Sequence, residues 1–206
     1  MRFAYAGPGV RRWHITRVAM YRALENRLAA LDGPDRSCLC ISASEGLARI
    51  AGLGQAKLSP ASYPEVNLLA LPYPDASFDF LVSDQVLEHV EGDPFRAVAE
   101  SIRVLRPGGR AIHTTCFVNQ VHGAPSDFWR FTPQALELLV TAAGGEVELA
   151  GGWGNRAALT VIDRGFRMKR IPETPGNPLF ELALRNEPDF PIVTWVVLRR
   201  GDAGGR

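Results

Sequence analysis

Two clusters of polar side chains near the middle of the sequence have the types and spacing for proton transfer. Glu88 and His89 lie one turn after Ser83-Asp84-Gln85, and His122 follows in a later segment. An imidazole with an unperturbed pKa near 6.5 can take a proton from a hydroxyl group at neutral pH. His89 and His122 are therefore the predicted catalytic bases. A structural histidine packed at a helix start is an equally good interpretation of His89.

The segment after His122 adds charged and aromatic side chains, which together can bind a sugar or another polar substrate. The predicted substrate-binding residues are Glu88, Asp127 and Arg130. In the alternative interpretation, Trp129 and Phe131 anchor the segment to the core while Arg130 pairs with Asp127. For the two aromatic side chains this alternative is preferred.

The three cysteines, Cys38, Cys40 and Cys116, are too few and oddly numbered for a disulfide framework. They are predicted to be reduced, buried thiols, because free cysteine behaves as a small hydrophobe. No histidine pair at metal-binding spacing accompanies them, so no metal site is predicted.

Alternating strands and helices must position these side chains. Helical periodicity and short apolar runs predict the elements, and Asp93-Pro94 and Thr132-Pro133 each supply a cap acceptor followed by proline. The predicted helices cover 13–31, 46–52, 94–105, 133–140 and 178–185. The predicted strands cover 38–41, 55–59, 66–68, 78–83, 110–117, 146–150 and 192–198.

This alternation with short links predicts an α/β fold, in which a mostly parallel sheet is covered by helices on both faces. Ligands of such sheets lie beyond the carboxyl ends of the strands. The residues that follow each strand are thus the predicted ligand contacts, at 42–46, 59, 67–69, 83–88 and 114–119.

Length and charge limit the function classes. The 206 residues suit a single domain over 1–206, with a helical N-terminal segment (1–34) and an insertion (152–190) before the last strand. A net charge of +1 argues against nucleic acid as a partner, and the basic cluster in the insertion is interpreted as a solvated face. Apolar stretches far shorter than about 20 residues argue against a membrane span. We expect a cytoplasmic protein with a small-molecule partner, and a homodimer is left open.

The segment LPYPDASFDFLVSDQVLEHVEGDPFRAVAESIRVLRPGGRAIHT, residues 71–114, resembles the fourth strand, the next helix and the fifth strand of class I S-adenosylmethionine-dependent methyltransferases. The similarity is greatest to the small methyltransferase-11-like type. It continues through HGAPSDFWRFTPQALELL (122–139) and NEPDFPIVTWVVLRR (186–200). The resemblance implies a doubly wound, mostly parallel seven-stranded Rossmann-like sheet with an antiparallel last strand. It also implies S-adenosylmethionine as cofactor and methyl transfer to a small molecule, with a glycan or a secondary metabolite as the expected acceptor.

The sequence departs from the family at the cofactor loop. The family has an acidic residue and then a G-x-G-x-G turn, where this chain has CLCISASEG (38–46). Cys40 takes the acidic position, and the glycine positions fall on Ser42, Ser44 and Gly46. The acidic ribose position aligns with Lys57.

The resemblance still implies a set of cofactor contacts. Glu65 is the nearest carboxylate that could replace the ribose ligand, and Asn67 takes the position of an aspartate that reaches the adenine amino group. The full predicted set is Ser42, Ala43, Ser44, Gly46, Ser59, Glu65, Asn67, Leu68, Ser83, Asp84 and Gln85. The alternative function is a catalytically inactive methyltransferase-like binding or scaffolding protein, because the loop is degenerate.

Overall fold

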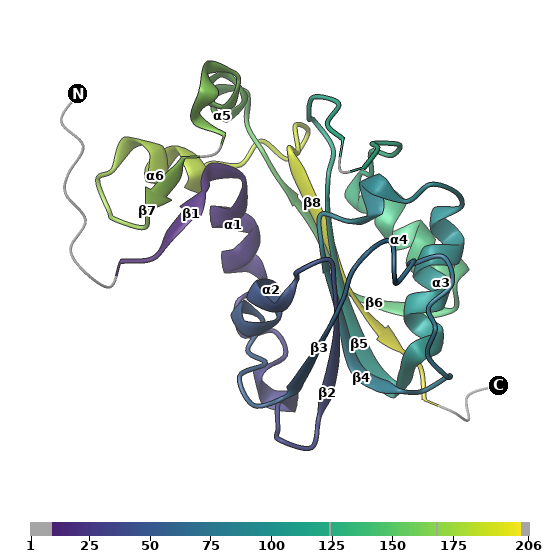
Figure 1. Cartoon of the computed structure of the whole chain (residues 1–206). Coiled ribbons are helices and arrows are strands. Elements are labelled where there is room, and N and C mark those ends of the chain that lie inside the picture. The colour runs from purple at the N-terminus through teal and green to yellow at the C-terminus, as the bar shows by residue number, and fades with distance from the viewer. Residues whose placement is uncertain (1–9, 124, 168, 203–206) are drawn as a thin grey trace.

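The computed structural model describes residues 10–123, 125–167 and 169–202, and its centre is a six-stranded sheet in the order β3-β2-β4-β5-β8-β6 (Figure 1). The strands are β2 (Ser37–Ile41), β3 (Lys57–Ala61), β4 (Phe78–Asp84), β5 (Leu105–Cys116), β6 (Gly145–Trp153) and β8 (Val193–Arg200). β8 runs antiparallel to both of its neighbours, and the remaining pairs are parallel. The predicted α/β sheet with an antiparallel last strand is confirmed.

The sheet has six strands in the described residues, so the expectation of seven is wrong. Segment 66–68, the expected third strand, forms a turn with one isolated bridge between Asn67 and Ala70. The Oδ1 atom of Asn67 accepts a hydrogen bond from the backbone N–H of Leu69 at 2.9 Å. A side chain that binds its own backbone in this way favours a turn over a strand.

Helices cover both faces of the sheet and create two hydrophobic cores. α1 (Ile15–Leu24) and α2 (Glu45–Ile50) lie on one face, and α3 (Pro94–Val104) and α4 (Pro133–Ala142) lie on the other. Within β2, Cys38 and Cys40 belong to the first core, whereas Leu39 and Ile41 belong to the second. A strand that is buried on both faces is a nearly continuous apolar run, as predicted for this segment. All three cysteines are free and buried, as predicted.

The two helix starts predicted at Asp93-Pro94 and Thr132-Pro133 are confirmed. The side chain of Asp93 accepts from the N–H of Phe95 at 2.9 Å, and that of Thr132 accepts from the N–H of Ala135 at 3.1 Å. The helix predicted over 13–31 is too long, because α1 ends at Leu24 and a 3-10 turn, η1 (Ala29–Leu31), follows.

The start of that predicted helix is instead a strand, β1 (Arg12–His14), which pairs antiparallel with β7 (Arg170–Pro172). Residues 1–9 of the predicted N-terminal segment lie outside the described residues. β7 belongs to the insertion, which also contains α5 (Arg156–Val161), a π-helical turn η3 (Ile162–Phe166) and α6 (Pro178–Leu184). α6 packs against α1, so the N-terminal segment and the insertion form one wall of the molecule (Figure 1). None of the described helices has the length and apolar character needed to cross a bilayer.

Candidate functional site

Two cavities open at the carboxyl ends of the strands, and Gln85 lines both of them. The larger cavity, of about 390 Å³, lies between the N-terminal segment, the insertion and the loop after β5. The smaller cavity, of about 280 Å³, lies over the end of β2, between the 63–68 turn and the segment that follows β4. Residues after four different strands therefore meet here, as expected for a doubly wound sheet.

The backbone around the smaller cavity takes conformations that are uncommon for residues with a side chain. Ser42, Ala43 and Gln85 have φ angles of 53°, 58° and 59°. Such left-handed residues gather at ligand sites, where the surrounding structure holds them in place. Gly46 is exposed and has open space around it, because a Cβ atom added to it would have no neighbour within 4 Å. The degenerate loop thus keeps a backbone turn and free space at its last glycine position.

Four of the predicted cofactor residues line the smaller cavity: Ser42, Asn67, Leu68 and Gln85. Ser44 does not, because its hydroxyl group points into the protein. It donates to the carbonyl of Ile41 and accepts from the N–H of Asp84 at 2.8 Å, with 1% of the residue exposed. Ser44 therefore ties the end of β2 to the end of β4.

Ser83 and Asp84 are also placed differently from the prediction. The hydroxyl group of Ser83 forms a 2.7 Å hydrogen bond with Nδ1 of His113, and both residues are fully buried. Burial lowers the pKa of His113 to about 4, so this imidazole is neutral at pH 7.

The carboxylate of Asp84 is occupied by protein groups. It accepts from the hydroxyl groups of Tyr21 at 2.5 Å and Thr114 at 2.7 Å, and Arg17 lies 3.6 Å away. Burial, together with the charge of Asp84, raises the pKa of Tyr21. Asp84 thus fixes α1 onto the sheet.

Ser59 and Glu65, two further predicted cofactor contacts, are not among the residues that line either cavity. β3 ends two residues later than predicted, so Ser59 is inside the strand and pairs with Leu39. Lys57 begins β3, at the opposite end from the cavities, so it does not occupy the ribose position. Glu65 is exposed and is not among the residues that line the smaller cavity.

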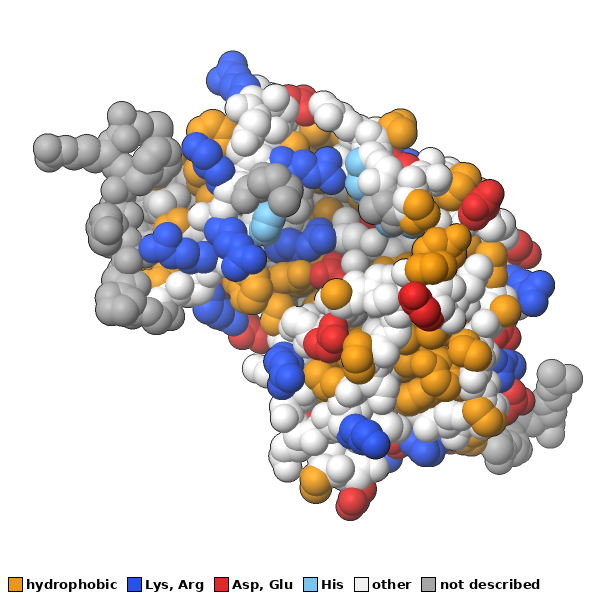
Figure 2. All heavy atoms as spheres, in the orientation of Figure 1, with side chains coloured by type: hydrophobic (Ala, Val, Ile, Leu, Met, Phe, Trp, Pro, Cys, Tyr) orange, Lys and Arg blue, Asp and Glu red, His pale blue; other side chains and the backbone are white. Residues whose placement is uncertain are grey.

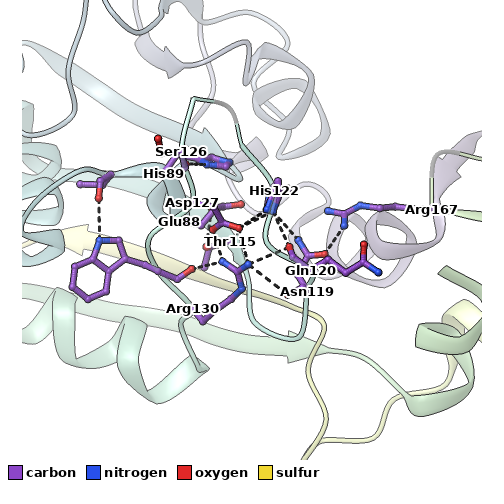
Figure 3. A network of polar contacts seen from close by, with 12 residues as sticks. Glu88, His89, Thr115, Asn119, Gln120, His122, Ser126, Asp127, Arg130 and Arg167 are labelled. Carbon is purple, nitrogen blue, oxygen red and sulfur yellow. Dashed lines mark hydrogen bonds and ion pairs between the residues drawn. The ribbon is translucent and has the colours of Figure 1, made fainter. Parts of the chain in front are cut away.

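Glu88, His89 and His122 come together between the two cavities, with one potential ligand atom from each lying within 4.8 Å of the others (Figure 3). The two imidazole rings meet edge to face, with centroids 5.0 Å apart. His89 lines the smaller cavity and His122 lines the larger one. Glu88 lies in the 3-10 turn η2 (Leu87–His89) and is fully buried, and burial raises the pKa of its carboxyl group.

Asp127 and Arg130 position His122 rather than line a cavity. Figure 3 shows Asp127 between Arg130 and His122, with contacts to both. The carboxylate accepts from the backbone N–H of His122 at 2.8 Å and lies 3.0 Å from its Nδ1 atom. Its hydrogen bonds to Arg130 lower the pKa of Asp127 below its usual range.

The alternative interpretation of the aromatic pair holds for Phe131, whereas Trp129 is 37% exposed and its side chain is held by a hydrogen bond. Phe131 is buried, and the indole N–H of Trp129 donates to the carbonyl of Val90 at 2.9 Å. None of the three predicted substrate contacts lines either cavity, because Glu88 is buried and Asp127 pairs with Arg130 within the loop after β5.

Sequence reasoning missed most of the larger cavity. Its basic lining comes from Arg12 and Arg17 at the N-terminus and from Arg167 and Arg170 in the insertion. Figure 2 shows basic side chains gathered on this face around a hollow above α1. The cluster in the insertion was visible in the sequence, but its pairing with β1 was not, so it was interpreted as solvated surface. None of the described residues that line this cavity is acidic.

Comparison with known proteins gives the family. A model of the methyltransferase domain matches residues 20–113. A probable S-adenosylmethionine-dependent methyltransferase of Mycolicibacterium smegmatis is 33% identical over 172 residues, which cover 73% of this chain and 66% of that protein. The chain spans 24% or less of the length of two further curated relatives.

Solved structures agree on the fold. The [4+2]-cyclase SpnF has a TM-score of 0.55 at 19% identity, over 98% of this chain and 87% of that one. Phosphoethanolamine N-methyltransferase 2 of Haemonchus contortus, in complex with S-adenosyl-L-methionine, has a TM-score of 0.55 at 13% identity, over 89% of this chain and 53% of that one. With the match of the domain model and the mycolicibacterial relative, the chain belongs to the class I S-adenosylmethionine-dependent methyltransferase family.

Proposed function

We propose that the protein is an S-adenosylmethionine-dependent methyltransferase that works as a single domain on a small anionic acceptor. The observation that carries the proposal is the pair of cavities that share Gln85 as a wall. Adjoining cavities can hold a donor and an acceptor next to each other. Holding two reactants close together in the right orientation lowers the free-energy barrier of a reaction by about 7 to 11 kcal/mol in favourable cases.

The residues of the smaller cavity fit an adenosyl group. Ile41 and Leu68 supply apolar surface, and Ser42 and Asn67 supply hydrogen-bonding groups. The open space at Gly46 leaves room for a ligand close to the start of α2. When bound, S-adenosylmethionine supplies an electrophilic methyl group on a sulfonium. The side-chain amide of Asn67 would hold the edge of the adenine, while its Oδ1 atom also keeps the turn in place.

The larger cavity supports an acceptor that carries a carboxylate or a phosphate group. Guanidinium groups bind both anions through paired hydrogen bonds, and four arginines line this cavity. Trp13 and Tyr21 meet edge to face, with ring centroids 5.0 Å apart, and add an aromatic wall. A sugar acid or a phosphorylated metabolite has an anionic group for the arginines and a surface that can pack against the aromatic wall. The proposed acceptor is therefore an anionic member of the predicted class, a glycan or a secondary metabolite.

The imidazoles at the boundary of the cavities support a hydroxyl acceptor. His89 and His122 lie where an acceptor oxygen would meet the methyl group, and they would assist the loss of its proton. The predicted cytoplasmic location and a homodimer stay predictions.

A catalytically inactive methyltransferase-like binding protein is the second candidate. Cys40 is buried at the position of the family's acidic residue, and Asp84 is already bound by Tyr21, Thr114 and Arg17. The ammonium group of the cofactor would therefore lack a free carboxylate from either position. Folds of this kind also support other chemistries.

Thermal unfolding with S-adenosylhomocysteine, the demethylated product of the cofactor, separates the two candidates. A ligand at 100 times its Kd stabilises the folded state by about 2.7 kcal/mol. We expect the wild-type protein and the control Ser62→Phe to gain several degrees in Tm, because Ser62 is exposed outside the cavity. Ser42→Phe, which fills the cavity, should show no gain. No shift of the wild-type protein at millimolar ligand would favour the inactive candidate.

The acceptor class is tested by transfer of a labelled methyl group to a mixture of small carboxylic and phosphoric acids. We expect labelled product from the wild-type protein and at least tenfold less from Arg170→Glu, whose thermal shift with S-adenosylhomocysteine stays unchanged. Equal labelling by both proteins, or labelling of neutral compounds alone, would contradict an anionic acceptor.

A further inference from the structure

Glu88 has an unsatisfied oxygen in the protein interior. Its Oε2 atom accepts from the hydroxyl group of Thr115 at 2.8 Å, but its Oε1 atom is buried without a hydrogen-bond partner. None of the described Lys, Arg or His side chains forms an ion pair with Glu88, because the nearby Arg130 is paired with Asp127. A buried carboxylate is stable only if it is paired, protonated or bound to a metal. The free oxygen is therefore a position where a cation would be favoured.

In each of the two neighbouring imidazoles, those of His89 and His122, the Nδ1 atom contacts an oxygen atom of the protein. Nδ1 of His89 lies 2.6 Å from the carbonyl oxygen of Ser126, and Nδ1 of His122 lies 3.0 Å from the carboxylate of Asp127 (Figure 3). For His89, the carbonyl acceptor favours the tautomer with the proton on Nδ1, which leaves the lone pair of Nε2 available. Nδ1 of His122 also lies 3.2 Å from the carbonyl oxygen of Gln120 and 3.3 Å from the amide nitrogen of Asn119, so two acceptors and one donor face it. Metal-binding histidines are held in the same way by a carboxylate or a carbonyl group.

We propose that Glu88, His89 and His122 bind a divalent transition-metal ion through one carboxylate oxygen and two imidazole nitrogens. Such a mixed set suits zinc, manganese, iron or cobalt better than magnesium or calcium. Ligands bonded at about 2.1 Å to one ion lie roughly 3 to 4 Å apart. The three atoms lie within 4.8 Å of one another, so a shift of about 1 Å in one side chain would complete the site.

The place of the cluster gives such an ion a role, which rests on the proposed function. His122 faces the acceptor cavity and His89 faces the cofactor cavity, so the ion would stand at their boundary. Three protein ligands leave further coordination positions for a hydroxyl group of the acceptor. A bound cation lowers the pKa of an oxygen ligand, so the two histidines would help to remove the proton as ligands and not as free bases.

Metal binding to the full chain, without cofactor or acceptor, tests the proposal. After treatment with a chelator, we expect titration with Co²⁺ to give one ion per chain with a visible absorption band, and Zn²⁺ to displace it. His122→Asn should weaken Co²⁺ binding at least tenfold, because it removes one of the three ligands. The matched control is His14→Asn, since His14 lies outside the cluster and should leave the stoichiometry and affinity unchanged.

Glu88→Gln supplies a second variant that keeps the hydrogen bond to Thr115, and circular dichroism shows whether each variant folds. Absence of one tight ion from the wild-type protein, or equal binding by His122→Asn, would overturn the metal site. Because this readout needs no S-adenosylhomocysteine, the metal site can fail while the cofactor binds, and it can hold while the methyltransferase proposal fails.

Discussion

Ser44 does structural work at a position where the family has glycine. Its hydroxyl group binds a carbonyl at the end of β2 and an N–H group at the end of β4, and water is excluded from both bonds. Glycine would remove both of these hydrogen bonds. The serine side chain therefore takes up space in the loop, but it also holds the ends of β2 and β4 together.

Ser44→Ala is expected to lower the free energy of unfolding by about 1 to 3 kcal/mol, because it removes two buried hydrogen bonds, with the N–H of Asp84 and the carbonyl of Ile41. Urea denaturation measures the change. Ser42→Ala is the control, and it should change stability by less than about 0.5 kcal/mol, because Ser42 is exposed. Similar losses in both variants would contradict the role assigned to Ser44.

The sequence indicated the rim at the ends of the strands but not which side chains face the smaller cavity. Ser42, Asn67, Leu68 and Gln85 line the smaller cavity, whereas Ser83 and Asp84 are bound within the protein. The end of a strand follows from its apolar pattern. The direction of each later side chain depends on turn geometry and on partners such as Tyr21, which is 63 residues away from Asp84. Such distant contacts leave no local pattern.

The insertion forms a wall of the larger cavity, and Asn155 holds its helices together. Its Oδ1 atom caps α5 by accepting from the N–H of Ala158 at 2.7 Å. Its Nδ2 atom donates to the carbonyls of Leu182 and Arg185 at the end of α6. One buried side chain thus joins the start of one helix to the end of another.

Asn155→Ala is expected to destabilise the protein by about 2 kcal/mol, because it removes a helix cap and the hydrogen bond to the carbonyl of Arg185, while the carbonyl of Leu182 keeps the N–H of Arg185 as a donor. Asp93→Ala removes a cap alone, on α3, and should cost about 1 kcal/mol. Hydrogen exchange should become faster in 179–185 for Asn155→Ala and stay unchanged there for Asp93→Ala. An unchanged rate in α6 would show that Asn155 does not join the helices.

The sequence predicted the helices and strands that have a local sequence signal, such as a proline at the helix start or an apolar run. The proline starts of α3, α4 and α6 and the apolar runs of β2, β4 and β8 lie close to their observed positions. β1 and β7 were missed because each has three residues and exists only through pairing with the other. The basic cavity that they help to enclose was missed for the same reason.

His113, a buried group in the sheet, should make the stability of the whole molecule depend on pH. His113 lies in β5 in the middle of the sheet, and burial lowers its pKa from 6.5 to about 4. The unfolded chain therefore binds more protons than the folded chain between these values, so stability falls as pH falls from about 6.5 towards 4.

We expect His113 to reduce the free energy of unfolding by on the order of 2 kcal/mol between pH 7.5 and pH 5. His113→Asn cannot titrate, so its stability should change less over the same range. Urea denaturation at several pH values measures both slopes, and parallel curves for the two proteins would exclude His113 as the cause.

The order of strands in the sheet bears on how the chain is made. β6 has a single partner in the sheet, β8, which is also what connects it to β5. When β6 has emerged from the ribosome, it cannot yet join the sheet, because β8 has not been synthesised. The whole insertion must emerge before β8 can pair with β6. Phe128 is the last described residue along the chain that lines the smaller cavity, whereas the larger cavity also needs residues as late as Val193. Under the proposed function, a nascent chain would therefore have the residues of its donor cavity before those of its acceptor cavity.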